Sequence, residues 1–329
     1  MTAHILCTLP LHPTGLELLK GKATISVLPS TDTHLLARYV SCADYLVVRT
    51  LLPTDVFETP NRLRGVVRHG TGLDFIPVEA ATARGIPVAN VPGANTQAVV
   101  EYCAASLLTW ARRTDVVTSR MRTHGWDDAR RHATGATELC GKTIGIVGVG
   151  SIGAKLANLC AHGFGMRVLG YQRRLEILPE FVHGVDLDSL IVESDYVVLT
   201  CPLTQTTHRL MNSDRLSRMK PHAVLVNAAR GAVIDEDALV TALRHGRLRG
   251  ASLDVFATQP LPDLHPLREL DNVLITPHVG GITEESTAAM SVGTAKQLLQ
   301  LMAGQRPTHL VNPEVWDRAM TRRLERFSA

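Results

Sequence analysis

The sequence of 329 residues contains few aromatic side chains, no long hydrophobic run and no large excess of charge of either sign. Phe, Trp and Tyr make up 4% of the residues, and no basic segment is interleaved with aromatic residues, so no nucleic-acid partner is expected. No stretch approaches the roughly 18 consecutive apolar residues of a membrane-spanning helix, so no membrane association is expected. The formal net charge of +3 is too small to indicate a polyanionic partner.

The cysteines are scattered and show no spacing typical of a metal site. They occupy positions 7, 42, 103, 140, 160 and 201, without a CxxC pair. Cys103, Cys160 and Cys201 lie in apolar segments, where buried thiols are expected. This usage predicts a cytoplasmic protein without a metal centre. The first residues lack a charged segment followed by a long apolar core, so no signal peptide is expected.

The length and the alternation of segments predict an α/β protein of two domains. A chain of this size exceeds what one hydrophobic core usually covers, and strand-like and helix-like segments alternate as in parallel sheets. The predicted strands are residues 4–8, 45–49, 65–69, 86–89, 143–147, 167–171, 196–200, 223–227, 250–253 and 272–276. The predicted helices are residues 14–19, 54–57, 77–83, 97–112, 154–162, 235–245 and 284–302, and the polar stretch 123–140 has no assigned element.

A glycine-rich loop near the middle of the chain is the most informative motif. A β-branched run leads into Gly148-x-Gly150-x-x-Gly153 and then into an apolar segment of helical period. In a dinucleotide-binding turn, the first glycine allows a tight turn, the second lets the backbone approach a pyrophosphate, and the third allows close helix packing. The diphosphate would rest on the N–H groups at the helix N-terminus, around Ser151 and Ile152. The alternative is a strand, turn and helix without a ligand; the order of the elements favours the dinucleotide site.

The position of this loop predicts the domain organisation. Because a nucleotide-binding fold begins close to residue 143, another unit must occupy the residues before it. We expect residues 99–288 to form a Rossmann domain inserted into a flavodoxin-like substrate domain of residues 1–98 and 289–329. Both domains are predicted to be doubly wound parallel sheets.

Four polar residues follow predicted strands in the second part of the chain. Arg230, Asp254 and His278 come directly after strands, and Gln259 lies a few residues beyond Asp254. Open α/β sheets bind ligands beyond the carboxyl ends of their strands, so these side chains are candidates for a reaction site. Each also has an ordinary interpretation: Arg230 as a surface cation, His278 as a turn cap, and Asp254 as a helix N-cap.

An arginine and a histidine at one sheet edge suit the reduction of a 2-keto acid. The arginine can hold the carboxylate through two parallel hydrogen bonds and polarise the carbonyl. The histidine can protonate the developing alkoxide, while a nicotinamide cofactor supplies hydride. The joint placement of these residues beyond one sheet edge favours the catalytic interpretation.

The chain resembles the D-isomer-specific 2-hydroxyacid dehydrogenase family over nearly its whole length. This family includes phosphoglycerate, glyoxylate/hydroxypyruvate and D-lactate dehydrogenases. The resemblance is carried by RHGTGLDFIPVEAATARGIPVANVPGAN (68–95), ELCGKTIGIVGVGSIG (138–153), CPLTQTTHRLMN (201–212), MKPHAVLVNAARGAVIDEDALVTAL (219–243), ASLDVF (251–256) and NVLITPHVGGIT (272–283). These motifs are long and jointly very specific.

The resemblance implies an enzyme that interconverts a 2-keto acid and a D-2-hydroxy acid. Arg230 would bind the substrate in catalysis, and His278 beside Gln259 would be the acid/base. The family is typically a homodimer joined through its nucleotide domains. The apolar helix at 97–112 is consistent with such burial.

The resemblance also implies residues that bind the substrate and the cofactor. Backbone amides of Gly70, Thr71 and Gly72 would cradle the substrate carboxylate, with Asn95 nearby. The cofactor would contact the glycine loop and three further residues. These three are Thr96, Pro202 and Asp254, the last at the nicotinamide carboxamide.

The chain departs from the family pattern after the second strand of the nucleotide fold. NAD-binding members usually place an acidic residue there, about 20 residues after the glycine loop, to hold the ribose 2′-hydroxyl. Here that position is Gln172, followed by Arg173 and Arg174. A carboxylate would repel a 2′-phosphate, whereas the two arginines could bind it, so NADP is predicted over NAD. The alternative is an NAD enzyme with two solvent-facing arginines.

A second departure is Gln259, where most of the family has glutamate. A carboxylate beside the histidine stabilises imidazolium and raises its pKa, while a neutral amide only orients the ring. The formate dehydrogenase branch has glutamine here and needs no proton transfer, so formate-dehydrogenase-like hydride transfer is one alternative. A nucleotide-sensing scaffold, like the corepressor relatives of the family, is another.

Two cations of the first domain leave a further alternative open. Arg49 and Arg68 follow predicted strands and resemble positions that phosphoglycerate dehydrogenases use for phosphate. They predict either a pocket for a second anionic group of the substrate or ordinary salt bridges. The sequence does not choose between them.

Overall fold

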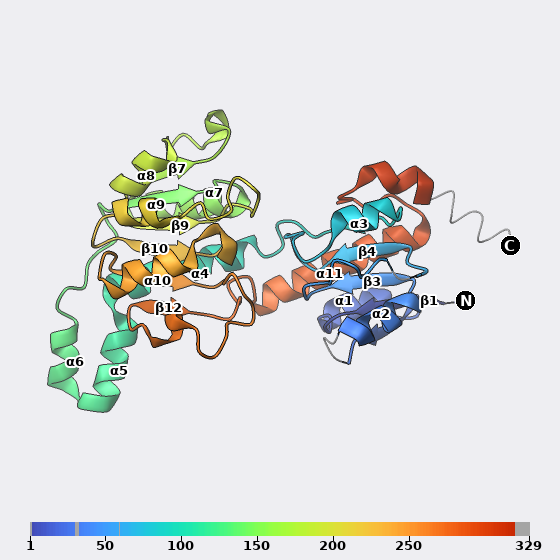
Figure 1. Ribbon diagram of the computed structural model, residues 1–329, viewed down its shortest axis with the longest axis horizontal. Helices are drawn as coiled ribbons and strands as arrows, with labels where there is room; N and C mark the ends of the chain where they lie inside the picture. The colour runs from blue at the N-terminus through green and yellow to red at the C-terminus, as the bar shows by residue number, and fades with distance from the viewer. Residues whose placement is uncertain (1, 30–32, 59, 320–329) are drawn as a thin grey trace. The chain divides into compact units, whose positions relative to one another are not determined.

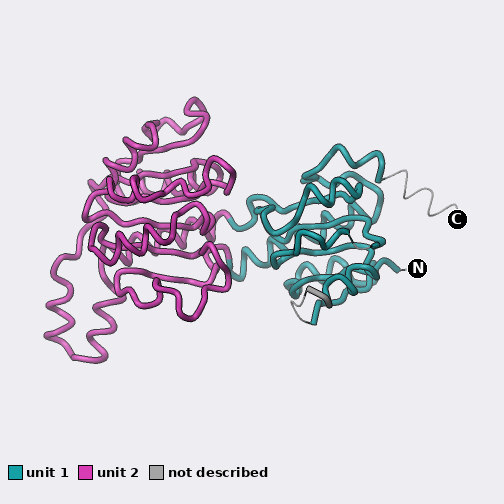
Figure 2. Tube along the Cα trace, viewed as in Figure 1, with its two compact units in different colours: residues 1–95, 282–329 teal, residues 96–281 magenta. Residues whose placement is uncertain are grey.

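The computed structural model describes residues 2–29, 33–58 and 60–319. The chain divides into two compact units: unit 1 is residues 1–95 with 282–329, and unit 2 is residues 96–281 (Figure 2). The divisions lie three and seven residues before the predicted boundaries at 98/99 and 288/289.

Unit 1 contains a five-stranded parallel sheet in the order β2-β1-β3-β4-β5 (Figure 1). This is the flavodoxin-like strand order. Its elements are β1 (Ala3–Cys7), α1 (Pro13–Leu19), β2 (Ala23–Val27), α2 (Thr33–Ser41), β3 (Tyr45–Val48), β4 (Gly65–Arg68), α3 (Val78–Ala83), β5 (Val88–Ala89), α11 (Glu284–Ala303) and the 3-10 helix η5 (Pro313–Val315).

Successive residues of the unit 1 strands face different layers of helices. In β1, Ile5 belongs to a buried cluster with Leu298 of α11, whereas Leu6 belongs to a cluster with Val40 of α2. The alternation follows from the two-residue period of a strand, and it requires helices on both faces of the sheet. Helix α11 begins with a capping box at Thr283 and ends at Gly304, whose φ of 75° is left-handed.

The segment after α11 completes unit 1 at the edge strand β5. Ala89 forms an antiparallel bridge with Leu310. The buried side chain of Asn312 accepts a hydrogen bond from the Val88 amide (2.8 Å) and donates to the Ile86 carbonyl (3.0 Å). The β5 edge is therefore covered by residues from the far end of the chain.

Unit 2 contains a seven-stranded parallel sheet in the order β12-β11-β10-β9-β6-β7-β8. The order reverses between β6 and β9, which is the topological switch point of a Rossmann fold. The strands are β6 (Thr143–Val147), β7 (Arg167–Tyr171), β8 (His183–Gly184), β9 (Tyr196–Leu199), β10 (Val224–Asn227), β11 (Gly250–Leu253) and β12 (Val273–Ile275). The prediction of two doubly wound parallel sheets, one flavodoxin-like and one Rossmann, is confirmed.

The helices of unit 2 cover both faces of its sheet, except for two that project from it (Figure 1). They are α4 (Thr96–Arg112), α5 (Thr114–His124), α6 (Trp126–His132), α7 (Ser151–Asn158), α8 (Leu187–Glu193), α9 (Ser213–Arg218), α10 (Glu236–Arg244), a π-helical turn (Leu159–Gly163) and the 3-10 helices η2 (Leu175–Ile177), η3 (Gly231–Val233) and η4 (Pro266–Glu269). The projecting pair is α5 and α6, and α5 has no buried residue. None of the helices in the described ranges combines the length and apolar character needed to cross a membrane.

The sequence pattern misses elements that lack an apolar period. Among them are β2, an edge strand with no fully buried residue, and α5 and α6 in the polar part of the chain. The predicted helix at 54–57 is wrong, because these residues form turns. A segment of four residues makes only about one helical turn, which is not stable by itself. The expected burial of Cys103, Cys160 and Cys201 is confirmed.

Candidate active site

The glycine loop between β6 and α7 has a different constraint at each glycine. Gly148 has a φ of 96°, and a Cβ there would lie 2.7 Å from the Cys201 backbone. A Cβ on Gly153 would lie 2.3 Å from the Gly148 carbonyl oxygen. Around Gly150, by contrast, no atom lies within 4 Å of a Cβ position. Gly148 and Gly153 are therefore required by the fold, whereas Gly150 keeps space open in front of the loop.

The start of α7 fits the diphosphate of a dinucleotide. Gly150 is the N-cap, with extended backbone, and it has no side chain to cap the first turn. The first N–H groups of a helix lack intrahelical partners and attract anions. The open space at Gly150 and these N–H groups form a cradle that a side chain would fill. The residues present thus fit the nucleotide that the sequence predicts.

Two arginines follow β7, where the sequence predicts contact with the ribose of the cofactor. The Gln172 amide nitrogen donates to the Arg174 carbonyl oxygen (2.7 Å), which closes the turn. Arg173 and Arg174 are exposed. Within the described ranges neither guanidinium takes part in an ion pair, so both can bind an anion.

The His278 ring is oriented by Gln259. Its Nδ1 lies 3.0 Å from the Gln259 side-chain oxygen, and the Gln259 amide nitrogen donates to the Phe256 carbonyl (3.2 Å). Because the amide nitrogen is directed at a carbonyl, the amide oxygen faces the ring and accepts a hydrogen bond from Nδ1–H. The neutral ring therefore carries its N–H on Nδ1, and Nε2 is the unprotonated nitrogen.

The backbone around His278 is held by Asp254. His278 has a φ of 58°, in the left-handed region, and its N–H donates to the Asp254 carbonyl (2.8 Å). The Asp254 carboxylate is 3% exposed and accepts from the amides of Val279 and Gly280, each at 2.8 Å, and from the Thr276 hydroxyl at 2.7 Å. These bonds stabilise the strained turn that presents the imidazole. The nicotinamide contact of Asp254 stays a prediction.

Arg230 follows a turn that is fixed by a buried asparagine. The Asn227 side chain is fully buried, donates to the Arg230 carbonyl (3.0 Å) and accepts from the Ala229 amide (3.0 Å). A Cβ on Gly231 would lie 1.8 Å from the backbone carbon of Phe256. The Arg230 turn thus packs directly against the segment that carries Gln259. Strands β10, β11 and β12 are neighbours, so the three turns share one edge of the sheet.

In unit 1, Arg68 shapes the loop of residues 70–72. Its Nε donates to the Gly72 carbonyl (3.0 Å) and its Nη1 to the Val48 carbonyl (2.8 Å). The guanidinium lies 4.2 Å above the Phe75 ring. The Gly70 amide donates to the Arg68 carbonyl (3.0 Å), which differs from its predicted role toward substrate. Within the described residues no hydrogen bond involves the amides of Thr71 and Gly72.

Arg49 lies near Arg68 and a buried histidine. Its backbone amide donates to the Thr8 hydroxyl (2.9 Å), and its guanidinium donates to the Pro10 carbonyl. Burial, followed by the charges of Arg49 and Arg68, lowers the pKa of His69 to about 3. His69 is therefore neutral at ordinary pH and bonds to the Ser291 hydroxyl (2.8 Å). Because His69 is neutral, the positive charge around it comes from Arg49 and Arg68.

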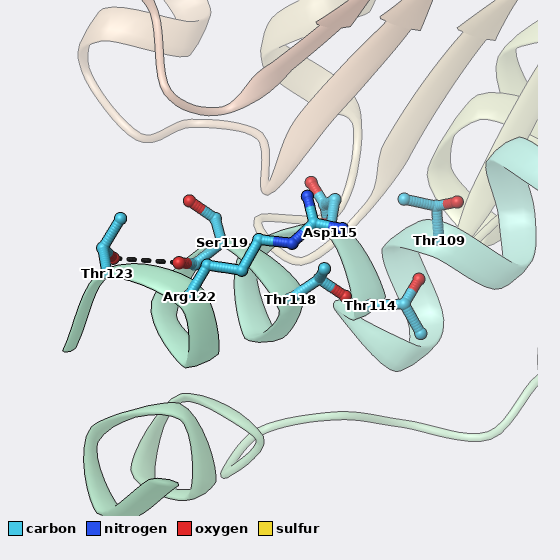
Figure 3. A pocket seen from close by; sticks show the side chains of 7 residues that line it. All are labelled: Thr109, Thr114, Asp115, Thr118, Ser119, Arg122 and Thr123. Carbon is cyan, nitrogen blue, oxygen red and sulfur yellow. Dashed lines mark hydrogen bonds between the residues drawn. The ribbon is translucent and has the colours of Figure 1, made fainter. Parts of the chain in front are cut away.

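Other features of unit 2 lie apart from these turns. A hollow of about 520 Å³ on α4 and α5 contains none of the predicted site residues (Figure 3). It is lined by Thr109, Thr114, Asp115, Thr118, Ser119, Arg122 and Thr123.

Among the described residues, no three His, Cys, Asp or Glu side chains gather as metal ligands would.

The sequence model described as "D-isomer specific 2-hydroxyacid dehydrogenase, NAD binding domain" matches residues 104–280. The chain belongs to the D-isomer-specific 2-hydroxyacid dehydrogenase family. The predicted resemblance is confirmed. The match covers most of unit 2, including the glycine loop and the turns of Arg230, Gln259 and His278.

Two curated members of the 2-hydroxyacid dehydrogenase family illustrate the similarity. The chain is 39% identical over 293 residues to a glyoxylate reductase of Korarchaeum cryptofilum, covering 87% of this chain and 88% of the relative. It is 37% identical over 314 residues to a D-3-phosphoglycerate dehydrogenase of Methanocaldococcus jannaschii. That match covers 94% of this chain but only 59% of the relative, so the chain spans little more than half of that protein.

Solved structures of the family have the same fold with different nucleotides. An NADPH-dependent glyoxylate/hydroxypyruvate reductase from Sinorhizobium meliloti, in complex with NADP and malonate, is 29% identical with a TM-score of 0.84, covering 95% of this chain and 98% of that one. An NAD-dependent formate dehydrogenase from Staphylococcus aureus, in complex with NAD, is 28% identical with a TM-score of 0.81, covering 90% and 95%.

The structure adds residues that sequence reasoning missed. Thr200 at the end of β9 donates to the Gly148 carbonyl (2.7 Å), and Thr207 donates to the carbonyl of Pro202 (2.7 Å). Thr200, like Asn227 and Thr276, is a short polar side chain at or just after a strand end. A short polar side chain at a strand end is the signal in the sequence that could have identified such residues.

Two predicted site residues lie where the chain passes from unit 1 to unit 2. Thr96 is buried at the start of α4, and Asn95 is the last residue of the first segment of unit 1.

Proposed function

We propose that the chain is an NADP-preferring reductase of a 2-keto acid, with His278 as proton donor and Arg230 as the residue that binds the substrate carboxylate. Family and relatives support the coarser statement, NAD(P)-dependent reduction of keto acids such as glyoxylate or hydroxypyruvate. The observation that carries the proposal is the His278–Gln259 pair. The pair places the ring N–H on Nδ1, and the segment that carries Gln259 packs against the turn of Arg230.

The proposed chemistry divides between two side chains. The Arg230 guanidinium would bind the carboxylate in two parallel hydrogen bonds and polarise the neighbouring carbonyl. As negative charge develops on the carbonyl oxygen, protonated His278 would donate the Nε2 proton to it, while Nδ1–H stays hydrogen-bonded to the Gln259 side-chain oxygen. The bound nicotinamide supplies the hydride. In unit 1, we propose that the Thr71 and Gly72 amides bind the substrate carboxylate.

The first test is turnover with a panel of 2-keto acids and both cofactors. We expect NADPH oxidation with at least one 2-keto acid, and kcat/KM at least tenfold higher for NADPH than for NADH, because Arg173 and Arg174 can pair with the 2′-phosphate. The double variant Arg173→Ser, Arg174→Ser should have a lower kcat/KM for NADPH and an unchanged kcat/KM for NADH. Arg167→Ser, an exposed arginine at the other end of β7, is the matched control. NAD preference above tenfold would end the NADP proposal.

The same panel separates the two alternatives. Formate oxidation without 2-keto acid reduction would indicate formate-dehydrogenase-like hydride transfer, which needs no proton donor. Nucleotide binding without turnover of any substrate would indicate a sensing scaffold. We favour reduction because Arg230 and His278 are both present and held by buried hydrogen-bond partners.

Gln259→Glu should move the pH profile of reduction upward. Reduction requires protonated His278, so kcat falls as pH rises through the pKa of the ring. A carboxylate at position 259 stabilises imidazolium, so the midpoint should rise by about one pH unit. The measurement is kcat against pH at saturating NADPH. Gln305→Glu, at an exposed position of unit 1, should not move it; an unmoved midpoint in Gln259→Glu contradicts the proton-donor role.

We also propose that Arg49 alone binds a second anionic group of the substrate. Both guanidinium groups donate to backbone carbonyls, but that of Arg68 makes more such bonds and also lies over the Phe75 ring, which favours a structural role for Arg68. Arg49→Met should raise KM about 10- to 100-fold for a 2-keto acid with a second carboxylate or phosphate, and less for glyoxylate. Arg68→Met should lower Tm and impair both substrates alike. Equal effects of Arg49→Met on both substrates would contradict the assignment.

We propose a homodimer joined through unit 2, on the basis of its projecting helices. Helix α5 has no buried residue, and two large apolar side chains beside its end are exposed, Met121 at 47% and Trp126 at 66%. Apolar side chains exposed on two projecting helices suit a contact with a second copy of the chain. The cytoplasmic location that the cysteine pattern predicts stays a prediction.

A further inference from the structure

A hydroxyl chain connects helix α4 to the turn that presents His278. The Tyr102 hydroxyl lies 2.8 Å from the Thr276 hydroxyl, and the Thr276 hydroxyl lies 2.7 Å from a carboxylate oxygen of Asp254. Tyr102 is on α4, far from this turn in the sequence, and no family motif of the chain includes it.

The direction of the chain follows from the chemistry of its end. An ionised carboxylate only accepts hydrogen bonds, so the Thr276 hydroxyl must donate its single proton to Asp254. Thr276 can then only accept from Tyr102, and Tyr102 must be the donor. Burial is the main cause that raises the pKa of Tyr102 to about 12, so the hydroxyl keeps its proton over the working pH range.

The Tyr102 ring also packs on the turn itself. A Cβ on Gly280 would lie 3.2 Å from two ring carbons of Tyr102 and 2.8 Å from the Asp254 carboxylate. The ring and the carboxylate therefore confine Gly280 from two sides. The same carboxylate holds the Val279 and Gly280 amides, directly after His278.

We propose that Tyr102 is a positioning residue for His278, acting through Thr276 and Asp254. The tyrosine proton orients the Thr276 hydroxyl toward Asp254, and the oriented carboxylate fixes the backbone of residues 278–280, in which His278 is left-handed. Hydrogen bonds in such a chain strengthen one another. The proposal rests on the function proposed for His278 where it concerns catalysis, but its structural part can be measured without turnover.

The test combines Tyr102→Phe, Thr276→Val and Thr276→Ser. Tyr102→Phe should lower kcat about 3- to 10-fold, the range expected for one lost hydrogen bond, with KM for cofactor and substrate changed less than about twofold. Amide hydrogen exchange in the segment 278–281 should become faster by a similar factor. Thr276→Ser keeps the hydroxyl and should behave as wild type, whereas Thr276→Val should not. Tyr39→Phe, in α2 of unit 1, is the control for loss of a tyrosine hydroxyl.

The double variant decides whether Tyr102 acts through Thr276. Adding Tyr102→Phe to Thr276→Val should produce no further loss of kcat or amide protection, because the acceptor is already gone. Additive losses, or unchanged exchange in Tyr102→Phe, would overturn the proposal. If the wild type reduces no 2-keto acid but amide exchange in 278–281 is still faster in Tyr102→Phe, the proposed function is wrong and the positioning role of Tyr102 is supported. If His278→Ala abolishes turnover but Tyr102→Phe has the kcat and amide exchange of the wild type, the proposed function is supported and the positioning role of Tyr102 is wrong.

Discussion

Replacing Arg230 by methionine is expected to lower kcat/KM for the 2-keto acid at least about 1000-fold. The change removes a bidentate partner of the substrate carboxylate and a positive charge beside the carbonyl; loss of one such donor alone costs about 100- to 1000-fold. Methionine keeps much of the aliphatic stem, and the turn is held by Asn227 through the backbone. NADPH affinity and Tm should therefore remain close to wild type, as fluorescence titration and thermal unfolding would measure.

Two further variants sharpen this prediction. Arg230→Lys keeps the charge but loses the planar fork, so its kcat/KM should lie between those of wild type and Arg230→Met. Arg244→Met removes an exposed arginine of α10, whose closest carboxylate is Glu269 at 3.9 Å, and should leave turnover unchanged. Full activity in Arg230→Met would remove the arginine from the proposed reaction.

Replacing Gly150 by valine is expected to weaken NADPH binding at least about 100-fold without unfolding the protein. The Gly150 φ of −81° is accessible to any residue, and a Cβ there meets no atom within 4 Å, so the free chain should accept the side chain. The isopropyl group would occupy the space in front of the α7 N-terminus and exclude the diphosphate from its N–H groups. Binding calorimetry with NADPH and a Tm measurement separate the two effects.

The neighbouring glycine provides the matched comparison. Gly153→Ala places a methyl group 2.3 Å from the Gly148 carbonyl, so it should lower Tm, with or without nucleotide. If Gly150→Val binds NADPH as wild type does, the diphosphate does not rest where we propose. If it unfolds, the space at Gly150 belongs to the fold and not to a ligand.

The sequence predicted those parts of the fold in which buried apolar residues follow the pattern of a strand or a helix. The strands predicted at residues 143–147 and 196–200 contain β6 and β9 because their side chains are buried on both sheet faces, which leaves a nearly continuous apolar run. Strand β2 and helix α5 escaped because half-exposed edge strands and solvated helices carry no such signal. Their positions depend on contacts with other elements, which a local pattern does not contain.

The candidate site was predictable where a motif fixes a residue and not where distant residues meet. The glycine loop, Arg230 and His278 follow strands within recognisable segments. The hydrogen bond from Gln259 to Phe256, which sets the histidine tautomer, and the use of Arg68 as a loop support depend on the folded geometry. Tyr102 gave no signal at all, since a tyrosine in an apolar helix is expected to be a packing residue.

The two-segment construction of unit 1 has a consequence for synthesis on the ribosome. Residues 96–281 are contiguous and can fold as soon as they emerge, whereas residues 1–95 emerge without α11, whose Leu298 covers one face of their sheet. They also lack Asn312, which covers the β5 edge through Val88 and Ile86. Unit 1 must then close a loop that contains all of unit 2, and long loops make folding slow. An incomplete nascent chain would expose apolar surface and an open edge strand, which are the features that chaperones bind and that lead to aggregation.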